Sequence, residues 1–185
     1  MFFLYLGLII FFTTHLLPTT ANIRQSLQDR LGYFPYLSLY SALSLFGFIL
    51  IIYGFGQSPH ILLWSPLAIG KILTMALMPF AFVLLISAYV NGHIKNKLKH
   101  PMLIATMIWS SVHLTTNGDL ASTLIFGSFF VYAIVAIAIS KPHKSLIPKG
   151  TTNWIFDLVA IVLGIAICAL VIYKHQYIAG VPIVS

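Results

Sequence analysis

The sequence is poor in charged residues and almost free of cysteine. Of 185 residues, 7% are charged, three are acidic and none is glutamate. Because the carboxylates, at Asp29, Asp119 and Asp157, are far apart, no helix face holds a pair of them for acid–base catalysis. The single cysteine, Cys168, excludes an intramolecular disulfide, an iron–sulfur cluster and a C-x-x-C-H site for covalent haem, and is expected to be a buried structural thiol. Phosphate-binding loops and the common hydrolase and zinc-protease motifs are also absent.

Hydrophobic residues dominate instead. They make up 59% of the chain, whose mean hydropathy is +0.98, which predicts an all-α, polytopic integral membrane protein. A hydrocarbon core about 30 Å thick requires roughly 20 apolar residues per helix. The connections are short, so we expect residues 1–185 to form one domain. Six spans are predicted, at about residues 2–17, 37–55, 67–90, 101–116, 120–139 and 154–173.

The first span has neither a basic start nor a small-residue cleavage site, so we expect it to be retained. Alternate loops are basic, holding Arg24, Arg30, Lys95, Lys97, Lys99, Lys141, Lys144 and Lys149, whereas the opposite side has only Lys174 in the C-terminal tail. The positive-inside rule then predicts cytoplasmic basic loops and both termini on the non-cytoplasmic side, in a bacterial inner membrane. Contact with anionic lipid accounts for the net charge of +7, so the expected partner is the bilayer and not nucleic acid.

Histidines are the main candidates for function, because ionisable groups inside a membrane are costly. Four of the seven, His60, His93, His143 and His175, lie in predicted loops or tails, where a solvated or headgroup-contacting role is expected. The other three are His15, His100 and His113.

His15 lies near the end of the first span. Leu8, Phe11 and Phe12 precede it by seven, four and three residues, so helical periodicity places them on the same side of the helix. An imidazole beside an aromatic wall suits a flat hydrophobic ligand. The alternative is a histidine that hydrogen-bonds a neighbouring helix.

The fourth span lies within HPMLIATMIWSSVHLTTNGD. Trp109, His113 and Asn117 follow one another at four-residue intervals and share a helix face. His100 is thirteen residues before His113, which is a rise of roughly 20 Å and a rotation of about 140°, so the two cannot easily serve one centre. His100 is expected near the cytoplasmic surface and His113 in the outer half of the bilayer.

The ends of this segment carry boundary signals. The pair His100-Pro101 favours an extended conformation at His100 and places Pro101 at the first position of a helix. Asn117-Gly118-Asp119 predicts a turn in which Asp119 caps the next helix.

Lys71 is predicted about five residues into the third span. It could snorkel to the interface, or it could meet an anionic group of a cofactor or substrate. A non-catalytic assembly or transport partner is a further hypothesis for the chain.

The fourth span and the apolar span after it resemble the signature of the NnrU family of small membrane proteins, through the segment HPMLIATMIWSSVHLTTNGD. FFTTHLLP with its downstream arginine resembles that family's first span, and the likeness covers residues 2–173. It implies a link to denitrification and nitric oxide metabolism, with an apolar substrate or a redox partner.

The resemblance also extends to the related 15-cis-zeta-carotene isomerases, which are haem b enzymes. It implies that His15 and His113, the matching positions, ligate a non-covalent haem iron. The resemblance thus implies a carotenoid-isomerase-like role as one alternative to a redox role. Those enzymes have a cysteine three residues before the second histidine, where this chain has Ser110, so neither their redox-linked ligand switch nor their isomerase activity carries over directly. A second pair of haem ligands is also possible, because His15 and His113 are expected at different depths in the membrane. His15 is expected about 20 Å and His113 about 10 Å below the outer surface. His15 could therefore pair with His100 instead.

A different class of function is suggested by KHPM, which resembles the R-H-P motif of isoprenylcysteine carboxyl methyltransferases that bind S-adenosylmethionine. Those enzymes carry further acidic and arginine residues in their C-terminal helices. This chain has no arginine after Arg30 and no glutamate.

Overall fold

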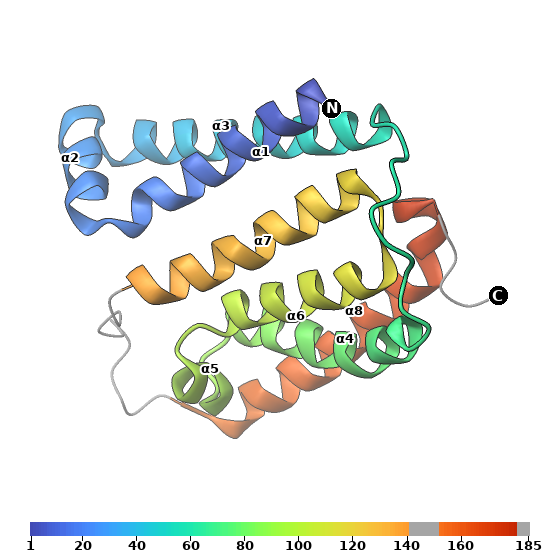
Figure 1. The fold of residues 1–185 in the computed structure, drawn as a ribbon. Helices are drawn as coiled ribbons and strands as arrows, with labels where there is room; N and C mark the ends of the chain where they lie inside the picture. Colours follow the sequence, from blue (N-terminus) through green and yellow to red (C-terminus); the bar gives the residue numbers. More distant parts are fainter. Residues whose placement is uncertain (141–151, 181–185) are drawn as a thin grey trace. The chain divides into compact units, whose positions relative to one another are not determined.

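The computed structural model describes residues 1–140 and 152–180, and these residues fold into helices with no β-strand beyond the isolated bridge between Leu62 and Asp119 (Figure 1). The predicted cytoplasmic residues Lys141, His143, Lys144 and Lys149 lie outside the described part. The elements are α1 (Phe2–Leu16), the 3₁₀ turn η1 (Leu17–Thr19), α2 (Ala21–Leu31), α3 (Tyr33–Gly56), α4 (Gly70–Ser87), α5 (His93–Leu98), α6 (Pro101–Thr116), α7 (Leu120–Ile139) and α8 (Trp154–Ala179).

Five of these helices, α1, α3, α4, α7 and α8, are long and apolar enough to cross a membrane. The protein is therefore a multi-pass integral membrane protein with an all-α fold, as predicted. The helix α6 has 16 residues and is about 24 Å long, which is short of the full hydrocarbon core. The count of six spans and the sides of the termini stay predictions.

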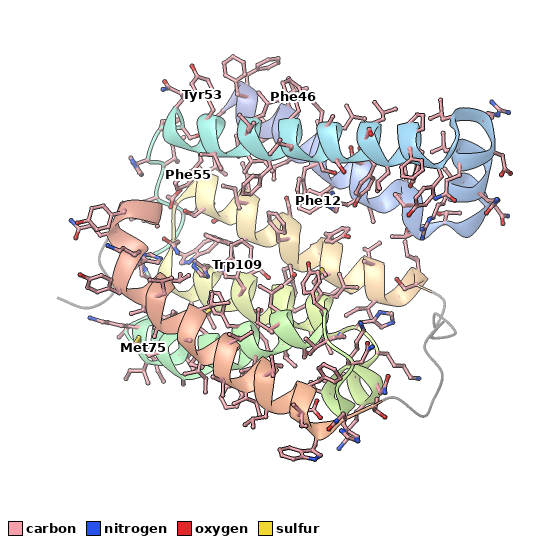
Figure 2. All side chains as sticks on the ribbon, turned by 180° about the vertical axis from the view of Figure 1, so that it is seen from behind. Phe12, Phe46, Tyr53, Phe55, Met75 and Trp109 are labelled. Carbon is pink, nitrogen blue, oxygen red and sulfur yellow. The ribbon has the colours of Figure 1, made fainter. Side chains whose placement is uncertain are left out.

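The surfaces of these helices are apolar. Phe46 and Tyr53 project outward from α3, as Figure 2 shows, and 51% and 53% of their respective surfaces are exposed. Met75 of α4 is exposed to a similar degree. Side chains of this kind on the outside of a helix match hydrocarbon rather than water.

The chain divides into two compact units, the first made of α1, η1, α2, α3 and α7 and the second of α4, α5, α6 and α8. In the first unit α1 and α3 run antiparallel and pack closely through glycine. A Cβ on Gly54 would collide with the backbone of Leu4, and a Cβ on Gly47 would lie 2.9 Å from the nitrogen of Phe11. Small residues at such contacts allow helix backbones to approach, which is how helices associate in lipid.

The turn before α7 also belongs to the first unit. Asp119 is the N-cap of α7, and its carboxylate accepts a hydrogen bond from the backbone nitrogen of Ser122 at 2.9 Å, so the predicted cap is confirmed. The carbonyl of Gly118 accepts hydrogen bonds from the nitrogens of Leu63 and Trp64. The turn is therefore tied to the segment that follows α3, at the end of the unit away from α2.

In the second unit α4 packs against both α6 and α8. Its buried core includes Met78, Ala81, Val112 and Cys168, so the thiol is buried as predicted. Gly164 of α8 lies against the backbone of Val83, where a Cβ would be 2.6 Å from the Val83 Cα. The helix α4 continues through Pro79 without a break.

The short helix α5 is held by α8. The carboxylate of Asp157 accepts hydrogen bonds from the backbone nitrogens of His93 and Ile94 at 2.9 and 3.0 Å, and from Nδ1 of His93 at 2.8 Å. His93 is 63% exposed, as expected for a loop histidine, but its pairing with Asp157 was not predicted. The start of α8 and the loop of Lys95, Lys97 and Lys99 therefore lie at the same end of this unit.

Candidate functional site

His15 is anchored to its own helix. Its Nδ1 donates a hydrogen bond to the carbonyl oxygen of Phe11, 2.8 Å away, and its ring stacks on that of Phe11 with centroids 4.0 Å apart. The predicted aromatic side of α1 is thus present and fixes the imidazole.

Two tyrosines from other helices complete the surroundings of His15. The ring of Tyr40 in α3 lies 5.6 Å from the imidazole, and the ring of Tyr132 in α7 lies 6.1 Å from it in an edge-on arrangement. Neither was predicted, because helical periodicity within one segment says nothing about which residues of other helices approach it. The only signal was the presence of tyrosine within apolar spans.

His113 repeats the arrangement of His15. Its Nδ1 donates to the carbonyl oxygen of Trp109 at 2.7 Å, and the two rings are 5.2 Å apart. In both cases the histidine bonds the residue one turn earlier, and that residue is aromatic.

This shared hydrogen bond has a chemical consequence. A carbonyl oxygen only accepts, so Nδ1 must carry the proton in both rings. In a neutral imidazole the lone pair is then on Nε2, which is the arrangement of most metal-ligating histidines. The donor chemistry of His15 and of His113 therefore fits an axial ligand of haem iron.

An apolar hollow lies near each histidine. In the first unit a groove of about 440 Å³ runs between α1 and α7, with Phe12 and Tyr132 in its walls. In the second unit a hollow of about 220 Å³ is lined by α4 and α6, with Phe82 and Trp109 among its residues. Each histidine therefore contacts an aromatic side chain that lines an apolar hollow, Tyr132 for His15 and Trp109 for His113.

The other predicted site residues lie at helix ends. His100 precedes α6, and its carbonyl accepts the hydrogen bond of Ile104 at 3.1 Å, so it starts the helix as predicted. Lys71 is the second residue of α4, exposed, and nearer to the helix end than predicted, because α4 begins at Gly70. Asn117 follows α6 directly, in the turn.

Ser110 occupies the position at which the related isomerases have cysteine. Its side chain is completely buried, and its hydroxyl donates to the carbonyl of Thr106 at 2.7 Å. The residue therefore contributes to the packing of α6 and bonds its own helix.

Among the described residues, no group of three or more histidine, cysteine or acidic side chains could hold a metal ion by itself. His15 belongs to the first unit and His113 to the second. Each unit thus supplies one histidine with the same donor chemistry.

Asp119 lies at the start of the membrane-spanning helix α7, as its N-cap. Burial alone would raise the pKa of Asp119, but hydrogen bonds from the side chain and backbone of Ser122 outweigh it and hold the pKa below its usual value. Nearby His60 acts in the same direction. The group is therefore an ionised cap, with a structural role.

Comparison with known proteins identifies the family. The sequence model described as NnrU protein matches residues 3–183. No curated protein and no solved structure matches the chain. Because the match covers both units and nearly the whole sequence, the chain belongs to the NnrU family of membrane proteins.

Proposed function

We propose that this membrane protein binds one haem b, with His15 and His113 as the axial ligands of its iron. The observation that carries the proposal is the repeated hydrogen bond from Nδ1 to the carbonyl one turn earlier, at 2.8 Å in His15 and 2.7 Å in His113. That bond orients each ring and makes Nε2 the coordinating nitrogen.

The surroundings of both rings support the same proposal. Phe11 stacks on His15 and Trp109 packs beside His113, and both aromatic residues are apolar neighbours that a porphyrin face requires. These side chains also exclude water from the imidazoles. The alternative ligand His100 begins α6, where its carbonyl takes part in the first turn, so a helix-start role accounts for it.

The role that follows is redox chemistry in the membrane, linked to nitric oxide metabolism as the family resemblance implies. A bound haem supplies a one-electron couple at iron. The residues of this chain would position the ring and tune the basicity of its ligands through the Phe11 and Trp109 carbonyls. Ser110 cannot provide a thiol, which argues against the redox-linked switch of the related isomerases.

We further propose that the protein lies in the bacterial cytoplasmic membrane, with both termini on the non-cytoplasmic side. In the second unit the contact of Asp157 with α5 brings the start of α8 to the basic Lys95–Lys99 end. In the first unit the turn at Gly118 is tied to the segment after α3, opposite the arginines of α2. Within its own unit, each contact is consistent with the topology that the positive-inside rule predicts.

The test is an absorption spectrum of the full chain, purified in detergent from haem-supplemented cells. The proposal predicts a Soret band, and a haem-to-protein ratio near one by pyridine haemochrome assay. A folded, helical preparation with no Soret band, before or after addition of haemin, would refute it.

A further inference from the structure

The groove between α1 and α7 is large enough for a small molecule. It has a volume of about 440 Å³, which falls in the range of small-molecule sites. Its α7 wall extends from Thr123 to Val135, inside the predicted span, so its contents come from the membrane phase. His15 is not part of its lining, and Tyr132 stands between the two.

The floor of the groove is formed by a glycine. A Cβ on Gly127 would meet nothing within 4 Å, unlike Gly47 and Gly54 of α3, which pack against backbone. The missing side chain of Gly127 therefore makes space for something other than a helix. Beside it, the rings of Phe12 and Tyr132 lie 5.3 Å apart with an angle of 39° between them, and Phe12 lies on the face of α1 nearest to α7 (Figure 2).

Two hydroxyl groups in the groove have no acceptor. Among the described residues, no hydrogen bond joins the hydroxyl of Ser128 or of Tyr132 to the protein. Helical serine in lipid normally donates to a carbonyl one turn earlier, as Ser110 and Ser111 do here. A hydroxyl without a partner is costly in the absence of water, so the ligand should supply acceptors.

The placement of these hydroxyls on one helix face indicates the kind of ligand. Ser128 and Tyr132 are four residues apart in α7, and both line the groove, so one ligand can contact both side chains. A flat ring with acceptors on two opposite edges could accept a hydrogen bond from each of them. An acyl chain offers no acceptor at this depth, whereas a quinone offers two carbonyl oxygens, a flat ring for Phe12 and Tyr132, and an apolar tail.

We infer that the α1–α7 groove binds an isoprenoid quinone, with its ring over Gly127 and its carbonyls accepting hydrogen bonds from Ser128 and Tyr132. This inference goes beyond the proposed haem site and does not depend on it. If both sites are occupied, Tyr132 contacts both the quinone ring and the imidazole of His15.

The test is calorimetric titration of the detergent-purified full chain with decylubiquinone, and with decylbenzene as a ligand that has the same tail but no carbonyls. We expect saturable binding of decylubiquinone and at least tenfold weaker binding of decylbenzene. Ser128→Ala and Tyr132→Phe should each weaken quinone binding about threefold to tenfold, the effect of one lost hydrogen bond, and should leave decylbenzene unaffected.

Gly127→Leu fills the groove and should abolish binding. The matched control is Gly56→Leu, since a Cβ on Gly56 also meets nothing within 4 Å but lies away from the groove. Helicity and unfolding temperature show whether each variant folds. Equal affinity for the two ligands, or unchanged quinone affinity in both Ser128→Ala and Tyr132→Phe, would overturn the inference and leave an acyl-chain groove. No haem is needed for the titration, so its failure is distinct from failure of the haem proposal.

Discussion

Gly54 of α3 lies against the backbone of Leu4 in α1, with no room for a side chain between them. This contact and the neighbouring one at Gly47 set the distance between α1 and α3. The aromatic neighbours of His15 depend on it, because Tyr40 approaches the imidazole from α3.

Gly54→Ala should therefore destabilise the protein by about 1–3 kcal/mol, the usual effect of adding a methyl group to a filled contact. Unfolding of the purified protein, by heat or by added SDS, measures the change. Gly56→Ala is the control two residues away, where the added methyl group meets open space, and it should change stability by less than about 0.5 kcal/mol. Equal effects of the two substitutions would show that the close helix contact is not what Gly54 provides.

Asp157 should be needed for the order of α5. Asp157→Ala removes the acceptor of the His93 and Ile94 amides, so these amides should exchange with deuterium about fivefold to thirtyfold faster, as expected for loss of a cap of about 1–2 kcal/mol. Hydrogen exchange followed by mass spectrometry resolves this segment. Asp29→Ala serves as the control, because Asp29 is an exposed carboxylate that accepts a hydrogen bond from Gln25 of the same helix. Unchanged exchange in Asp157→Ala would refute the link between α8 and α5.

The cap at Asp119 should make stability depend on pH. Its pKa is lower in the folded protein than in the unfolded chain, so the ionised carboxylate favours folding. This contribution is complete above the ordinary pKa and is lost as the pH falls through the folded value. Between about pH 6 and pH 3 the unfolding temperature of the wild type should fall more than that of Asp119→Asn, which still caps but does not titrate.

Because His60 contributes to the low pKa of Asp119, the comparison is best made in a His60→Gln background. The difference between aspartate and asparagine should persist there. Parallel pH profiles of the two proteins would show that the charge of Asp119 contributes nothing.

The boundaries of the fold could be predicted where the sequence carries chemical signals. The His100-Pro101 start and the Asn117-Gly118-Asp119 turn are local signals, and they place the beginning and end of α6 and the beginning of α7 correctly. The helices α2 and α5 were not predicted, because both are short and polar and lack apolar periodicity. The stability of α5 comes from Asp157, which is 63 residues or more away in sequence.

The candidate site shows the same division between local and distant effects. The aromatic residue one turn before each histidine could be read from the spacing of Phe11 and His15 and of Trp109 and His113. Tyr40 and Tyr132 could not, because their approach depends on how α3 and α7 pack against α1. The groove over Gly127 was missed for a similar reason, since one glycine in a span can serve either a close contact or an open space.

The most direct test of the central claim is the absorption spectrum of the haem-loaded protein in three single variants. Haem binding through His15 and His113 predicts that His15→Ala and His113→Ala each lose the six-coordinate low-spin spectrum, while His100→Ala retains it. Because α6 also begins at His100, His100→Asn is included to preserve the helix start. Retention of the six-coordinate spectrum in His113→Ala, together with its loss in both His100 variants, would contradict the account and assign the second ligand to His100.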